Sequence, residues 1–125
     1  MNVQVVVQGN QSVVEGVAGA RLLEAPEDIV PLIGVCLVLK ARSVLLYAEN
    51  LTGRFFDLSS GEAGAVLQKF RNYRIRVSVV LLPGGVPQSN KFREMVAEEL
   101  RGNDLRIFDD RAPAEAWLTG TAPSG

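Results

Sequence analysis

Short β-branched runs alternate along this chain with longer segments of helical periodicity, and this alternation restricts the fold more than any other feature. Valine-rich segments over 3–7 and 13–17 flank Gly9 and Asn10, a dipeptide typical of a hairpin turn. Beyond the hairpin, helical and strand patterns follow one another to residue 118. Because helices that connect strands favour parallel pairing, we expect an α/β domain of order β-β-α-β-α-β-α-β-α, with a mixed, largely parallel sheet covered by helices.

The expected elements after the hairpin have definite positions. They are helices over 26–40, 60–72, 89–101 and 113–118, and strands over 43–48, 74–82 and 105–108. The helix over 26–40 has apolar residues on nearly all sides, which predicts that it is well buried. Residues 1–118 are therefore expected to form one domain, and the small, polar residues 119–125 to form a disordered tail.

Composition limits the classes of function. The chain has 125 residues, a net charge of -1, a single cysteine and no histidine. The near-neutral charge argues against nucleic acid as a partner, and the longest apolar run, 29–39, is too short for membrane insertion. Without histidine the commonest general base and metal ligand are missing, so we expect no metal, no cofactor and no enzymatic activity. Cys36 and the lack of a secretory start predict a cytoplasmic protein with a small buried thiol.

The junction from Asp57 to Glu62 is the main candidate site. The order Ser59-Ser60-Gly61-Glu62 fits a capping box at the start of a helix, where free N–H groups and the helix dipole also suit an anion. Phosphorylation of Ser59 or Ser60 would add ~1.5 to 2 negative charges there. An ordinary helix cap and a phospho-switch or anion site are both compatible with these residues.

A candidate interaction surface surrounds this junction. Glu49, Asn50 and Arg54 follow a predicted strand, and ligands favour the carboxyl ends of strands in open α/β sheets. Phe55 and Phe56 are adjacent, so an extended backbone would point one into the core and leave the other as a partner anchor. The predicted surface comprises Glu49, Asn50, Arg54, Phe55 and Glu62.

Two family resemblances extend these expectations. Phe56-Asp57, Ser59-Ser60-Gly61 and Ala65-Val66-Leu67 resemble the STAS domain of anti-sigma-factor antagonists, the SpoIIAA-like fold, although here Leu58 stands between the aspartate and the first serine. In that family a partner kinase phosphorylates the first serine of an Asp-Ser-Ser-Gly or Asp-Ser-Thr-Gly loop before the second helix. The resemblance implies a STAS-like fold and a protein partner, such as a kinase or an anti-sigma-like regulator.

The second resemblance is closer and covers most of the chain. Its residues are Glu49-Asn50-Leu51, Phe55-Phe56-Asp57-Leu58, Gly61, Ala63-Gly64 and Leu67-Gln68-Lys69-Phe70. On these motifs the chain is identified as a member of a bacterial family, domain of unknown function 4180. That family has no assigned activity, and the resemblance implies a small cytosolic α/β protein.

Three functions are compatible with these observations. The first is a non-enzymatic regulatory or protein-binding module that uses the junction as its contact, with a homo-oligomer as an open alternative. The second is a carrier-like domain that binds an apolar small molecule or lipid beside the helix over 29–39. The third is a serine hydrolase using Ser59 or Ser60, but Lys69 lies about 15 Å from Ser59 along the helix, too far to activate it.

Overall fold

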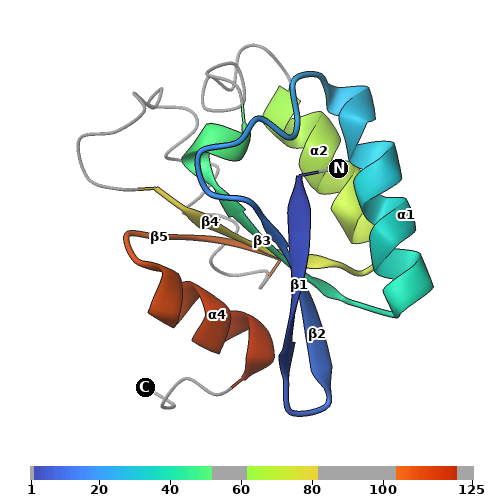
Figure 1. The fold of residues 1–125 in the computed structure, drawn as a ribbon. Coiled ribbons are helices and arrows are strands. Elements are labelled where there is room, and N and C mark those ends of the chain that lie inside the picture. Colours follow the sequence, from blue (N-terminus) through green and yellow to red (C-terminus); the bar gives the residue numbers. More distant parts are fainter. Residues whose placement is uncertain (1, 52–61, 82–103, 121–125) are drawn as a thin grey trace.

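The computed structural model describes residues 2–51, 62–81 and 104–120, and Figure 1 shows their arrangement. These residues form one five-stranded mixed sheet and three α-helices. The strands are β1 (Val3–Gln8), β2 (Gln11–Gly16), β3 (Ser43–Tyr47), β4 (Arg76–Val80) and β5 (Leu105–Phe108). The helices are α1 (Ile29–Leu39), α2 (Glu62–Asn72) and α4 (Arg111–Thr119), with short 3₁₀ turns η1 (Pro26–Asp28) and η2 (Ala48–Asn50).

The sheet has the order β1-β2-β3-β4-β5. Among the described strands, only β1 and β2 pair antiparallel, through the predicted hairpin, and Gly9 adopts the positive φ of 62° that the first turn residue needs. The strands from β2 to β5 pair in parallel, so their carboxyl ends meet at one edge. The predicted mixed, largely parallel α/β sheet is therefore confirmed for the described residues, and the predicted helix over 89–101 lies outside them.

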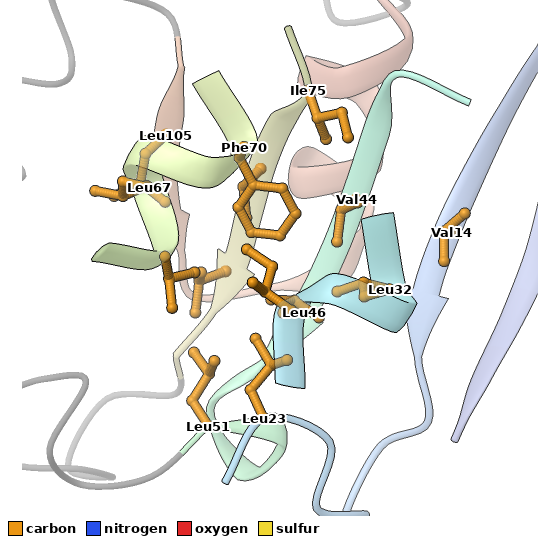
Figure 2. Packing of buried hydrophobic residues seen from close by; sticks show 14 of the residues in the cluster. Val14, Leu23, Leu32, Val44, Leu46, Leu51, Leu67, Phe70, Ile75 and Leu105 are labelled. Carbon is orange, nitrogen blue, oxygen red and sulfur yellow. The ribbon is translucent and has the colours of Figure 1, made fainter. Parts of the chain in front are cut away.

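The helices cover the two faces of the sheet unequally. Among the described α-helices, α1 and α2 lie side by side on one face, and α4 lies on the other (Figure 1). The larger core lies under α1 and α2, where Phe70 of α2 points at the strand layer beside Leu46, with Leu32 of α1 close by (Figure 2). A smaller core of Val13, Leu45, Val80, Ala114 and Leu118 joins α4 to the opposite face.

Local capping sets the limits of α1. The Asp28 carboxylate accepts hydrogen bonds from the N–H groups of Glu24 and Ala25, both at 3.0 Å, and so closes the turn that precedes the helix. At the other end Lys40 adopts a left-handed conformation (φ 56°), and the N–H of Ala41 donates to the carbonyl of Cys36 at 2.8 Å. The predicted helix over 26–40 is thus a 3₁₀ turn followed by an α-helix over the same residues.

The last helix extends slightly beyond its predicted end. α4 runs to Thr119, whose buried side chain donates a hydrogen bond to the carbonyl of Glu115 at 3.0 Å. The side chain of Gln11 donates to the carbonyl of Thr119 at 2.8 Å and so ties the helix end to the start of β2. Residues 121–125 of the expected tail lie outside the described residues.

Candidate functional site

Most of the predicted junction, and part of the predicted surface around it, lie outside the part of the chain that the structure describes. These residues are Arg54, Phe55, Phe56, Asp57, Ser59, Ser60 and Gly61. The described part of α2 begins at Glu62, and its predicted start near Ser60 lies outside the described residues. The anion site and the phospho-switch therefore stay predictions.

Asn50 belongs to the interior, so its assignment to the interaction surface is wrong. The side chain is 0% exposed, although Asn50 lies in the turn η2 that follows β3, at the end of a strand as the sequence predicts. Its Oδ1 accepts a hydrogen bond from the N–H of Tyr47 at 2.7 Å, and its Nδ2 donates to the carbonyls of Val17 and Ala20, each at 2.8 Å. All three hydrogen bonds of the amide are made with backbone groups of two neighbouring segments. The amide thereby satisfies polar groups that no strand or helix pairs.

Gly16 makes room for this amide. A Cβ built on Gly16 would overlap Oδ1 of Asn50 and would lie 2.7 Å from its Cγ. The close approach explains why β2 ends in a glycine at this position. Among the described members of the predicted surface, Glu49 has an exposed side chain.

The outer face of α1 is the largest departure from the expected burial. We use that name for Val30, Pro31, Gly34, Leu37 and Val38, which share the side of the helix away from the sheet. Val38 is 83% exposed, Val30 59% and Leu37 55%. The prediction that α1 is well buried is wrong for this face, because only its other side packs on the core.

The burial of α1 follows from the layer arrangement. Ile29, Leu32, Ile33 and Cys36 point to the sheet and are buried. α2 lies beside α1, not over it, so in the described structure it leaves the outer face uncovered (Figure 1). Since the whole helix is apolar, its sequence carries no polar stripe that would mark the side facing water.

The two ends of α1 differ in charge. A hollow of about 450 Å³ beside the N-terminal end is lined by Glu24, Asp28 and Pro31, and its other lining residues include one arginine, Arg21. A second hollow of about 330 Å³ beside the C-terminal end includes Lys40 and Arg42 in its lining. The outer face therefore runs from an acidic end to a basic end.

A second polar cluster lies at the carboxyl ends of β2 and β3, on the face covered by α4. Glu15 is 2% exposed, and its carboxylate accepts hydrogen bonds from Nη2 and Nε of Arg111 at 2.8 and 3.1 Å. The Tyr47 hydroxyl donates to the same carboxylate at 2.6 Å, and Arg111 also pairs with Glu115. We call these four residues the Glu15 cluster.

Sequence reasoning did not find this cluster. Its only sequence signal is a carboxylate two residues after the inward-facing Val13 in a valine-rich strand. Arg111 lies 96 positions away, so no local pattern joins the two residues.

The pKa values in the Glu15 cluster follow from its burial and hydrogen bonds. Burial alone would raise the pKa of Glu15, but the hydrogen bonds from Arg111 and Tyr47 outweigh it and hold that pKa below its ordinary value. The hydrogen bond to Glu15 also raises the pKa of Arg111. Burial, aided by the Glu15 carboxylate, raises the pKa of Tyr47 to about 12. The cluster thus keeps fixed charges near neutral pH, as a structural clamp does.

Trp117 anchors α4 on the sheet. Its ring lies 6.0 Å from that of Phe108, centroid to centroid, and packs against the smaller core. The guanidinium carbons of Arg76 and Arg106 lie 4.1 and 5.3 Å from the indole centroid, within the range of cation–π interactions. Within the described residues, the buried Nε of Arg106 has no hydrogen-bond partner.

Residues 2–51, 62–81 and 104–120 contain neither a membrane-spanning helix nor a cluster of metal-ligating side chains. None of the helices there combines the length and the apolar character that a bilayer span requires. No three His, Cys, Asp or Glu side chains in these ranges come together in a way that would hold a metal ion.

Comparison with known families assigns the chain to one of them. The family model described as Domain of unknown function (DUF4180) matches residues 8–118. The chain belongs to this family. The match spans the sheet from β2 to β5 and nearly all of α4, and it confirms the second resemblance drawn from the sequence. No curated protein and no solved structure matches the chain.

Proposed function

We propose that this DUF4180 protein is a non-enzymatic protein-binding module with a regulatory role. The observation that carries the proposal is the exposed, wholly apolar outer face of α1. Val30, Leu37 and Val38 are each more than half exposed on a helix without a charged side chain. Fully burying one such side chain contributes about 1.5–3 kcal/mol, so a protein that covers this face gains binding energy from it.

The arrangement of ionisable groups supports binding over catalysis. The carboxylate and guanidinium of the Glu15 cluster are engaged with each other and with Tyr47. The thiol of Cys36 is 0% exposed, and burial raises its pKa to about 11, which keeps it protonated and unreactive. These groups stabilise the fold and offer no activated nucleophile.

The proposal includes the predicted switch before α2. Ser59 and Ser60 precede the first residue of α2 in the chain, and the STAS resemblance suggests a kinase or an anti-sigma-like regulator as a partner. Phosphorylation there would add negative charge at a helix start and change the affinity of an acidic or apolar partner surface. Cytoplasmic location is part of the same proposal.

The binding proposal is tested by cross-linking in the native host with two matched variants. Val38→Glu places a charge on the outer face of α1, whereas Val7→Glu places the same charge on β1, where the valine is 66% exposed. We expect defined cross-linked adducts to disappear with Val38→Glu and to persist with Val7→Glu, with both variants folded by circular dichroism. Adducts that are insensitive to Val38→Glu would remove the outer face of α1 from the proposal.

The switch is tested separately. Ser59→Asp should change the set or yield of cross-linked partners, and Ser59→Ala should leave the unphosphorylated pattern in place. Identical patterns for Ser59→Asp and wild type, repeated for Ser60→Asp, would eliminate the switch and leave the binding surface untouched.

A further inference from the structure

The outer face of α1 has a symmetry that identifies its partner. Gly34 is the middle residue of α1, and Val30 and Val38 lie four residues on either side of it. Glu27 precedes the helix and Lys40 follows it, at nearly equal distances from the same centre, and both are exposed. The outer face of α1 is therefore apolar in the middle, with an acidic residue at one end and a basic residue at the other.

We propose that the occupant of this face is a second copy of the same chain, with the two α1 helices antiparallel about a twofold axis at Gly34. This inference rests on the proposed protein-binding function and names the partner. In a twofold interface every contact occurs twice: if one residue of the first copy contacts a second residue of the other copy, the reverse contact is also made. Val30 of one copy then faces Val38 of the other, and the acidic end of each helix faces the basic end of its partner.

Charge complementarity favours the antiparallel pair. Glu27 of each copy lies against Lys40 of the other, so the interface contains two such contacts. A parallel pair would place like charges together at both ends and would be disfavoured. The charge pattern along α1 thus selects one orientation of one partner.

Gly34 allows the two helices to approach closely. It is exposed, and a Cβ built on it meets no heavy atom within 4 Å, so the space over the centre of the face is open. Without a side chain at the axis, the valines on either side can reach the opposite helix. Leu37 and the half-exposed Tyr73 extend the apolar surface toward the basic end.

The small area of the outer face of α1 limits the expected affinity of the dimer. One face of an 11-residue helix, about 16 Å long, is smaller than the roughly 800 Å² per partner of a standard interface. We therefore expect a weak, concentration-dependent dimer with a dissociation constant of about 1–100 μM, which lies in the range of transient complexes.

Sedimentation equilibrium of the full chain from about 0.5 to 500 μM, a range that brackets that affinity, tests the proposal. We expect a monomer–dimer equilibrium that Val38→Glu weakens by at least about tenfold and that Val7→Glu leaves within about twofold. Because both valines are exposed, neither variant depends on repacking the core, and circular dichroism checks that each is folded.

Charge reversal at the two ends of α1 tests the antiparallel orientation directly. Glu27→Lys and Lys40→Glu should each raise the dissociation constant about tenfold, because each puts like charges in contact twice per dimer. The double variant should return to within about threefold of wild type. A double variant no better than the single ones would overturn the antiparallel pairing.

The remaining outcomes separate this inference from the proposed function. A wild-type protein that stays monomeric at 500 μM, while a different cross-linked protein is lost with Val38→Glu, would overturn the dimer and retain the binding module. A dimer lost with Val7→Glu and kept with Val38→Glu would place self-association on β1 and overturn the inference. Loss of neither dimer nor adduct with Val38→Glu would overturn both.

Discussion

Replacing Gly16 by alanine tests how tightly Asn50 is held in the interior. The added Cβ would overlap Oδ1 of Asn50 and lie 2.7 Å from its Cγ, so the amide must leave its site. Its hydrogen bonds with the N–H of Tyr47 and the carbonyls of Val17 and Ala20 would then be broken. At about 1 kcal/mol for each of the three bonds, we expect the free energy of unfolding to fall by about 3 kcal/mol.

Urea denaturation followed by circular dichroism measures this loss. Gly64→Ala is the matched control, because Gly64 is exposed within α2 and a Cβ there meets no heavy atom within 4 Å. Alanine in that helical position should raise the free energy of unfolding by about 0.5–1 kcal/mol. The same substitution thus has opposite effects at the two glycines.

A double-mutant cycle identifies the cause of the loss. In an Asn50→Ala background the amide is absent, so Gly16→Ala should cost less than about 1 kcal/mol. If Gly16→Ala alone costs less than 1 kcal/mol, or if its cost is unchanged by Asn50→Ala, the overlap described here does not determine the stability of this site.

Three further predictions concern single residues. The free energy of unfolding should fall as pH drops below about 4.5, because the pKa of Glu15 is depressed in the fold and its contribution is lost on protonation; Glu15→Gln should flatten this dependence in acid urea titrations, and an unchanged dependence would contradict that role. Arg74→Gly should raise the thermal midpoint, with a gain of about 1 kcal/mol, because Arg74 has a φ of 56°; an unchanged midpoint would contradict strain there. Cys36 should resist iodoacetamide in the native protein and react in urea, and rapid native labelling would contradict its burial and raised pKa.

The elements themselves were predictable because their signals are local. Gly9 and Asn10 mark the hairpin, and the spacing of Val66, Leu67 and Phe70 marks the buried side of α2, where all three are buried. Each signal lies within a few residues of the structure that it specifies. The described strands and helices therefore begin and end within about three residues of their predicted limits.

The candidate sites were less predictable because they depend on how layers pack. The sequence around Asn50 is typical of a polar surface loop. Its burial instead depends on the segment that contains Val17 and Ala20, some thirty positions away. The side of α1 that faces water is decided by how this helix packs on the sheet with α2 beside it, not by the uniformly apolar helix sequence. The partner of Glu15 lies 96 positions along the chain.

The clamp between Glu15 and Arg111 also constrains how the chain can be made. During synthesis the hairpin leaves the ribosome long before α4. The Glu15 carboxylate is therefore without its partner Arg111 for most of translation. The contact from Gln11 to Thr119 spans 108 positions and closes later still. Among the described helices, α4 covers the face of the sheet that carries Glu15, and in a ribosome stalled before residue 111 this helix would not yet cover that face.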